Sequence, residues 1–437
     1  MLRANSLLVG LLLMLLTACQ PTQPVEEAPP PATQEKIRTP VVDVTPTNSL
    51  EPVSWSEIPA SLFQDPGLAT WADALAQSAV YYRRLSPDKI LQFDSVPVTA
   101  RQMVQATTEL EGLARAGDGT RLHQVLQERF QLFRSVGNST NGDVLVTGYY
   151  EPLLRGSYTR SKRYYYPLYR RPPDLIDNSK DGIHRLEKGR PVKYYTRAEI
   201  DDFVYSKPTP PKPANKKKAN NKNKEKPVER VGKLGNRGLE LVWVDNAIDA
   251  FFLHIQGSGR VQLENGQILR LGYDSTNGRA FVPIGRILIE QGKIPKEEMT
   301  MPRLRQWLMD HPEQNKTLFF MNPSYVFFRE QTQTAVGNIN VPLTQDRSIA
   351  TDHRLFPKGA PAILTTTIPI MSADGSKVSA WQPETRLVVN QDTGGAIRGA
   401  GRVDLFFGFG PGVENRAGVM KQNRSSLYFI APRTDQR

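Results

Sequence analysis

Residues 387–408 read LVVNQDTGGAIRGAGRVDLFFG, two apolar runs joined by a glycine-rich segment. The apolar runs are typical of strands, and the glycines permit the close backbone approach and positive φ angles that a ligand site needs. Asp392 and Asp404 belong to this stretch, and a third aspartate, Asp352, follows residues 348–351. We therefore expect three aspartates at turn-like positions beside strands.

The residues around Asp404 predict a raised pKa for its carboxyl group. Phe406 and Phe407 follow it closely, and another carboxylate nearby would add like-charge repulsion. Desolvation and repulsion both raise the pKa of a carboxyl group, and a protonated carboxylic acid can donate a proton to a glycosidic oxygen. Any one aspartate in such a place can instead be a turn-former that bonds its own backbone. The prediction of a catalytic site therefore depends on all three aspartates together.

The N-terminal part of the folded chain has helical periodicity. Between residues 55 and 133, apolar side chains recur three or four positions apart, and Ser86-Pro87 ends a first helix. Two further helices are predicted over 99–116 and 120–133, with a turn at 117–119 between them.

The residue composition changes after these helices, from a helical pattern to one typical of strands. Residues 144–150 predict a strand, and later segments rich in Gly, Val, Ile, Tyr and Phe predict more. Helices interrupt them over 280–292 and 301–311. Because regular βα alternation is missing, we predict an α+β, mainly β protein with a β-barrel.

Composition limits the classes of protein that remain. The 437 residues predict two or three domains at roughly 100–200 residues per domain, and 39% hydrophobic content excludes a fully disordered chain. The single cysteine excludes an intrachain disulfide, and the five histidines form no H-E-x-x-H pair, so neither a metal nor another cofactor is expected. A net charge of +12 favours an acidic partner such as nucleic acid, an anionic membrane or an acidic polysaccharide.

Much of that charge comes from residues 207–230, which hold nine Lys or Arg against Glu225 and Glu229. The segment could hold an anionic polymer, or it could be a disordered surface insertion with nothing to bury. We favour the insertion, because no aromatic side chain is interleaved for base stacking. Nucleic acid is therefore not expected as a partner.

The N-terminal sequence predicts that the protein is secreted and attached to a membrane. Residues 1–18 have the short positive start and apolar run of a secretory signal, and Leu16-Thr17-Ala18-Cys19 resembles the lipobox of bacterial lipoproteins. Cys19 would then be lipidated, and residues 19–50 would form a proline-rich linker. Gln20 after the cut favours the outer membrane in lipoproteins generally, so we expect a lipid-anchored protein that faces the periplasm.

Four blocks carry a resemblance to a known family. They are 148–152 (GYYEP), 251–260 (FFLHIQGSGR), 322–329 (NPSYVFFR) and the C-terminal run 391–408. In this order they resemble the membrane-bound lytic murein transglycosylase A family with its three-aspartate domain, over roughly residues 50 to 437.

The resemblance implies a fold and a set of boundaries. The fold is a double-psi β-barrel with a second, β-rich domain inserted into the chain and the substrate groove between them. Residues 51–154 would hold the N-terminal helices and the first part of the barrel, 155–330 the inserted substrate domain, and 331–437 the three-aspartate part with the catalytic site.

The resemblance also implies an activity. The family cleaves the β-1,4 bond between N-acetylmuramic acid and N-acetylglucosamine of peptidoglycan and leaves 1,6-anhydro-muramic acid. Asp404 matches the family's single catalytic aspartate, and Asp392 matches a second of its three aspartates. From the chemistry of the reaction we expect Asp404 to act first as acid and then as base, and Asp392 to orient it. Expected substrate contacts are Tyr149, Tyr150, Glu151, Gln256, Ser258, Ser324, Tyr325, Gly394, Gly395 and, more weakly, Asp352.

Two alternatives stay open at this point. A second carboxylate opposite Asp404, for which Glu151 is the candidate, would make the protein a peptidoglycan hydrolase. A wall-binding lipoprotein without catalysis is the other. His254 is expected to be packed in an apolar strand. The expected partners are peptidoglycan strands, the outer membrane through the lipid anchor, and proteins of wall remodelling.

Overall fold

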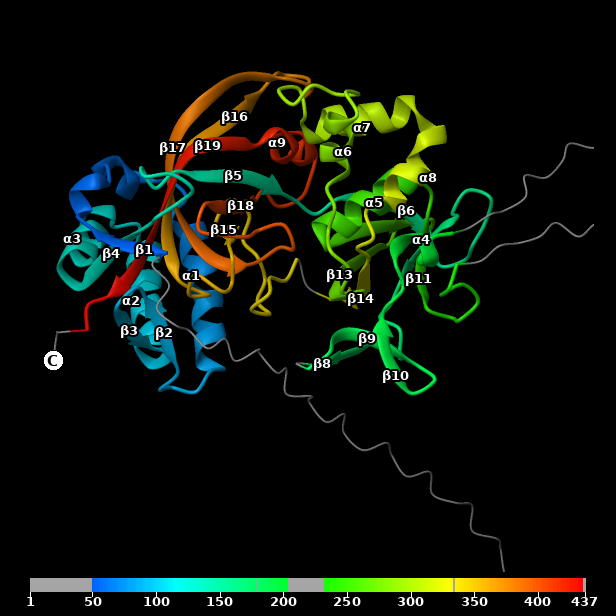
Figure 1. Ribbon diagram of the computed structural model, residues 1–437. Helices are drawn as coiled ribbons and strands as arrows, with labels where there is room; N and C mark the ends of the chain where they lie inside the picture. Colours follow the sequence, from blue (N-terminus) through cyan, green and yellow to red (C-terminus); the bar gives the residue numbers. More distant parts are fainter. Residues whose placement is uncertain (1–48, 179, 203–231, 333–334, 435–437) are drawn as a thin grey trace, which may run out of the picture. The chain divides into compact units, whose positions relative to one another are not determined.

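The computed structural model describes residues 49–178, 180–202, 232–332 and 335–434 (Figure 1). Its largest sheet contains β1 (Leu50–Val53), β4 (Phe130–Ser135), β5 (Val144–Tyr149), β15 (Ser348–Ala350), β16 (Pro361–Met371), β17 (Val378–Asp392), β18 (Arg402–Phe406) and β19 (Lys421–Pro432).

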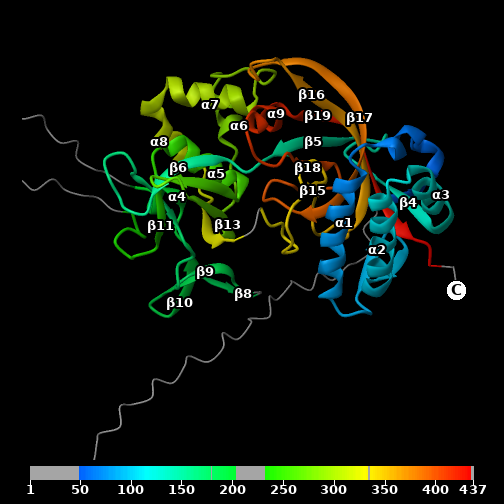
Figure 2. The same ribbon diagram turned by 180° about the vertical axis from the view of Figure 1, so that it is seen from behind.

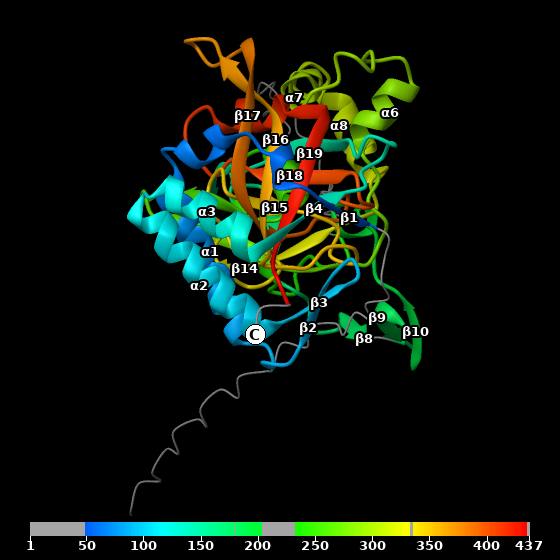
Figure 3. The same cartoon turned by 90° about the vertical axis from the view of Figure 1, so that its left-hand side faces the viewer.

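This sheet closes on itself. Its order is β1-β4-β19-β16-β17-β15-β18-β5. A further pairing between β19 and β5 closes the six strands from β19 to β5 into a barrel. Pairing is parallel between β15 and β17 and between β5 and β18, and antiparallel elsewhere in the ring. The predicted mainly β protein with a β-barrel is confirmed. In Figure 3 the β16–β17 hairpin extends beyond the other barrel strands.

The strands between Leu153 and Gln331 form other sheets. A six-stranded sheet has the order β14 (Val326–Gln331), β13 (Ile268–Thr276), β12 (Gly259–Leu263), β6 (Leu153–Ser157), β11 (Glu240–Val244), β7 (Tyr166–Tyr169). A smaller sheet in the same range consists of β8 (Ile176–Asn178), β9 (Gly182–Glu187) and β10 (Arg190–Lys193). Earlier in the chain, β2 (Ile90–Phe93) and β3 (Val96–Thr99) form a two-stranded sheet.

Helices cover the sheets in two groups. The first group is α1 (Leu68–Arg83), α2 (Ala100–Ala116) and α3 (Gly119–Arg129), preceded by the 3-10 turns η1 (Trp55–Glu57) and η2 (Ala60–Gln64). The second is α4 (Arg197–Ile200), α5 (Ala247–Gln256), α6 (Ile284–Glu290), α7 (Met301–Asp310), α8 (Pro312–Phe320) and α9 (Val413–Val419). Among the described residues, no helix is both long and apolar enough to span a membrane.

The predicted helix over 99–116 is confirmed as α2. Thr99 and Gln102 form a capping box at its start, and Gly117 ends it at a φ of 71°. The helix predicted over 120–133 is wrong at its C-terminal end. Phe130–Ser135 is strand β4 instead, because it pairs with β1 and β19 and buries Phe130, Leu132 and Phe133 in two core clusters.

Two other predictions need correction. His254 lies in helix α5, not in a strand, since Asn246 caps the start and Gly257 the end, while apolar residues face two separate cores. The helix expected over 280–292 is shorter, because Pro283 is its N-cap and α6 begins at Ile284.

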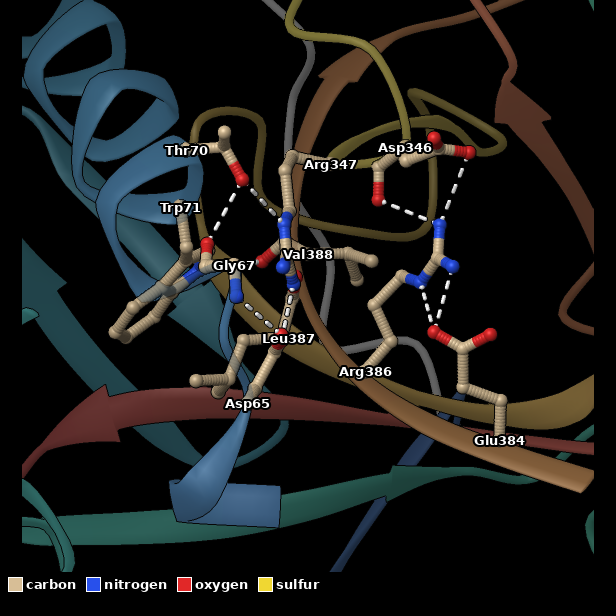
Figure 4. Close-up of polar contacts among 10 residues, drawn as sticks. All are labelled: Asp65, Gly67, Thr70, Trp71, Asp346, Arg347, Glu384, Arg386, Leu387 and Val388. Atoms are coloured by element: carbon tan, nitrogen blue, oxygen red, sulfur yellow. Dashed lines mark hydrogen bonds and ion pairs between the residues drawn. The ribbon is translucent and has the colours of Figure 1, made fainter. Parts of the chain in front are cut away.

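A buried arginine fixes α1 to the barrel (Figure 4). Arg347 pairs with Asp65 at 2.7 Å and donates to the Thr70 hydroxyl at 3.0 Å and the Leu387 carbonyl at 2.9 Å. Burial raises the pKa of Asp65, but the hydrogen bond and charge of Arg347 outweigh it, so the net pKa is lowered. Figure 2 shows α1 beside β17, the strand that ends at Asp392.

Candidate active site

Asp392 and Asp404 reach the same face of the barrel through the register of three strands. Ala350 of β15 pairs with Asp392 of β17 on one side and with Asp404 of β18 on the other. Residues opposite each other on neighbouring strands point to one face, and two strand spacings separate the Cα atoms of the two aspartates by about 10 Å. The structure therefore brings this predicted pair together.

The pair faces away from the barrel core. Val403 and Leu405, the neighbours of Asp404 in β18, are fully buried in the core cluster, whereas Asp404 stays partly exposed. Because side chains alternate along a strand, Asp404 projects to the other face. It lies within β18 and not at the turn-like position that the sequence suggested.

Asp404 has a single protein partner on the described part of the chain. The Thr147 hydroxyl of β5 donates to its Oδ1 at 2.8 Å, and no described residue donates to Oδ2. Burial raises the pKa of Asp404 to about 6, the charge of Asp392 adds to this, and Thr147 and Arg402 oppose it. The raised pKa predicted for Asp404 is supported, with burial as the main cause.

The position of the proton on the acid form follows from one contact. Arg402 donates to the Thr147 hydroxyl oxygen at 3.3 Å, and a guanidinium can only donate. With Arg402 on one lone pair, the Thr147 hydroxyl keeps its proton free to donate to Oδ1 of Asp404. While that bond is kept, a protonated Asp404 carries its own proton on Oδ2, the oxygen without a described partner.

Asp392 differs from Asp404 because its carboxylate is held by three donors. The Tyr149 hydroxyl donates to Oδ2 at 2.9 Å, and the backbone N–H groups of Thr393 and Asn338 donate to Oδ1 at 2.8 and 3.0 Å. Burial raises the pKa of Asp392, opposed by these donors and by Lys358. The arrangement fixes a carboxylate in place and suits a positioning group better than a proton donor.

Asp352 is separate from this pair. Its side chain is fully buried and receives Arg354 at 2.6 Å and the backbone N–H groups of Arg354 and Gly399. Burial raises its pKa, but these donors prevail and hold the pKa well below its usual range. Such contacts are those of a residue that ties two loops together, and they leave no oxygen facing outward for a ligand.

The residues after Tyr149 connect the barrel to α5. Tyr150 is buried, and its backbone N–H donates to the side chain of Gln256 at 3.1 Å. Glu151 is buried in an ion pair with Arg260 at 3.0 Å; burial raises its pKa and Arg260 opposes the shift. Asp392, and not Glu151, is the carboxylate whose charge acts on Asp404.

The other predicted contact residues vary in exposure. Tyr325 is 1% exposed and packs on His254, whose Nδ1 accepts from the Val326 N–H, so His254 is packed as expected. The partly or fully exposed ones are Ser258, Ser324, Gly394 and Gly395. Cys19 and residues 207–230 lie outside the described residues.

Sequence reasoning missed three residues of the site: Thr147, Arg402 and Lys358. Thr147 is 257 positions from Asp404, and strand register alone joins them. Lys358 donates from a buried position to the Asp392 carbonyl and the Asn390 side chain. Burial lowers the pKa of Lys358 to about 7, against the opposing charge of Asp392. No local sequence signal marked any of the three.

Two family models match the chain. The MltA specific insert domain matches residues 145–329, and the 3D domain matches residues 347–430.

Curated relatives and solved structures agree with these matches. Membrane-bound lytic murein transglycosylase A of Escherichia coli K12 is 31% identical over 307 residues, 70% of each chain, and that of Vibrio cholerae is 30% identical over 314 residues, 71% of each. A membrane-bound lytic murein transglycosylase from Agrobacterium tumefaciens superposes with a TM-score of 0.69 at 28% identity, covering 88% of this chain and 98% of that one. E. coli MltA with bound chitohexaose gives a TM-score of 0.61 at 26% identity, covering 84% and 90%.

Proposed function

Since the chain belongs to the membrane-bound lytic murein transglycosylase A family, and is a peptidoglycan lytic transglycosylase, we propose that Asp404 performs its acid and base steps alone. The observation that carries the proposal is the asymmetry of this carboxyl group. One oxygen is held by Thr147, the other has no described partner, and the pKa is raised to about 6.

In the first step, protonated Asp404 donates from Oδ2 to the glycosidic oxygen, and the bond between that oxygen and C1 of N-acetylmuramic acid breaks. In the second, the resulting carboxylate accepts the proton of the muramic C6 hydroxyl as its oxygen bonds to C1. The products are a 1,6-anhydro ring and a free hydroxyl on the leaving sugar. Asp404 is protonated again at the end, so the cycle closes without water.

One carboxylate suffices because the attacking hydroxyl is already part of the substrate. A well-oriented intramolecular attack is worth roughly 7–11 kcal/mol of the barrier. A hydrolase needs a second carboxylate that is free to activate water. Both oxygens of Asp392 are occupied by donors, and Glu151 is paired with Arg260. These contacts favour the lytic reaction over hydrolysis.

Asp392 assists as a fixed negative charge. Its charge raises the pKa of Asp404, which keeps the acid form populated, and it favours the positive charge that develops on C1. Tyr149 holds it in place, and the exposed Gly394-Gly395 turn, with Ser258 and Ser324, is proposed to contact the glycan.

The test is the mass of the soluble products from isolated peptidoglycan. We expect anhydro-muropeptides from the unmodified protein and none from Asp404→Asn. Products about 18 Da heavier, because water has been added, would refute the lytic assignment. Fragments released equally by Asp404→Asn would move the chemistry to another residue.

The double-psi topology of the barrel, the inserted domain and the cellular location are also proposals. The closed six-strand ring with its two parallel pairs supports a double-psi barrel, and the separate sheet built from residues 153–331 supports an inserted domain near 155–330. The relatives are named membrane-bound, which supports membrane association. We place the protein in the outer membrane through lipidated Cys19, facing the periplasm. Cys19→Ser should lose palmitate labelling and become soluble.

A further inference from the structure

The row of side chains that holds Asp404 continues beyond Thr147 to a cation. Thr147 pairs with Asp404 of β18 on one side and with Lys421 of β19 on the other. In-register residues share a face, so Lys421 begins on the same face as Asp404, with its Cα about 10 Å away. Lys421 is exposed and forms no ion pair with any described residue.

The row formed by Asp392, Ala350, Asp404, Thr147 and Lys421 carries opposite charges at its two ends. Asp392 and Asp404 stand at one end, and Lys421 stands at the other. Arg402 lies two positions from Asp404 along β18, on the same face, and its guanidinium reaches toward Thr147. Arg402 is half-buried and engaged there, which leaves Lys421 as the cation that can meet a bound molecule.

The substrate supplies a matching charge. In peptidoglycan, the muramic acid whose C1 reacts can carry a stem peptide, and such peptides bear free carboxylates. The negative charge of Asp392 repels such a group, and the positive charge of Lys421 attracts it.

Resting on the proposed function, we propose that Lys421 binds a carboxylate of the stem peptide and makes peptide-bearing, anionic peptidoglycan the preferred substrate. The ammonium is a compact charge on a flexible stem, which suits carboxylates whose position varies along the peptide. Lys421 is here a specificity-determining residue and takes no part in proton transfer.

The test compares kcat/KM on three synthetic glycans made of alternating N-acetylglucosamine and N-acetylmuramic acid. One carries stem peptides with free carboxylates, one carries the same peptides with these carboxylates converted to amides, and one is peptide-free with a free lactyl carboxylate. In Lys421→Met, the ratio of kcat/KM for free over amidated peptides should fall about two- to fivefold, within the range of one exposed ion pair. Lys421→Arg should keep the ratio.

Lys293→Met is the matched control, since Lys293 is likewise an exposed lysine but lies after α6, outside the strands that carry Asp404, Thr147 and Lys421. Its ratio should equal that of the unmodified protein. An unchanged ratio in Lys421→Met, or an equal loss on free and amidated peptides, overturns the proposal. A loss confined to the peptide-free glycan also overturns it, because the bound group would then be the lactyl carboxylate.

Failure of the proposed function would look different. It would appear as hydrated products from the unmodified protein on all three glycans, whatever the ratio measured for Lys421→Met.

Discussion

Asp404 and Asp352 are two carboxylates of one barrel with opposite surroundings. Asp352 receives a guanidinium and two backbone N–H groups, and its pKa is held low. Asp404 receives one hydroxyl, and its pKa is raised to about 6. Burial opposes the charged form of both, so the difference comes from the donors and from the neighbouring charges, Arg354 beside Asp352 and Asp392 beside Asp404. A carboxylate with many donors stabilises the structure, and one with few is kept ready for proton transfer.

Asp404→Asn should give the largest effect on activity. The amide can neither donate nor accept the transferred proton, so kcat should fall by about 10²–10⁴-fold, as for other general acid–base groups. Release of anhydro-muropeptides from isolated peptidoglycan measures it.

The stability of the same variant should change in the other direction. An ionised, poorly solvated Asp404 opposes folding at pH values above its pKa of about 6, so Asn should leave stability equal or raise it by about 1 kcal/mol. Urea unfolding at pH 7 measures this. A clear loss of stability would show that Asp404 is structural, like Asp352.

Asp352→Asn should do the reverse. We expect a loss of about 2 kcal/mol of unfolding free energy, because the buried Asp352 side chain loses the charge that Arg354 and the two backbone N–H groups bind. The activity of each folded molecule should stay within a few-fold of the unmodified protein.

The effect of Asp352→Asn should depend on pH with a known sign. The folded-state pKa is lowered, so the stabilisation is present above the unfolded pKa of about 3.9 and is lost as pH falls toward the folded value. The difference between the two proteins in urea unfolding should therefore shrink below about pH 4. A difference that grew on acidification would contradict the assignment.

Tyr149→Phe should weaken catalysis by about tenfold, since it removes one of three donors that fix Asp392, and one such bond is worth about 1–1.5 kcal/mol. Steady-state kcat is the readout. An effect as large as that of Asp404→Asn would mean that Tyr149 itself moves protons.

Thr147→Val should have the smallest effect on rate and a visible effect on the pH profile. The Thr147 hydrogen bond lowers the pKa of Asp404, so its loss should raise that pKa and move the alkaline limb of kcat/KM to higher pH. Thr147→Ser keeps the hydroxyl and should keep the profile. A limb that moves to lower pH would contradict the role of this bond.

The sequence alone was sufficient to predict the helices and strands that are determined by neighbouring residues. The capping residues around α2 and the alternation in β5 are written in consecutive residues. Phe130–Phe133 was misjudged as helix because strand pairing with β19, almost 300 residues later, overrides the local pattern. His254 was misjudged because a helix buried on two sides lacks the polar face that reveals helical periodicity.

The site divides in the same way. Asp404 and Asp392 were predicted from the glycines and aromatic residues around them. Thr147, Arg402 and Lys421 were out of reach, because only the register of β5 with β18 and β19 places them in one row. Asp352 is not part of the pair of Asp392 and Asp404 because the Arg354 side chain folds back and binds it. Residue spacing in the sequence does not predict this contact.

The most direct test of the central claim is the pKa of Asp404 itself, measured by NMR of protein labelled with ¹³C at the aspartate carboxyl carbons. The signal that disappears in Asp404→Asn identifies the residue. We expect this signal to titrate near pH 6, so that the group is an acid when substrate binds. A titration below pH 4, like that expected for Asp352, would contradict it.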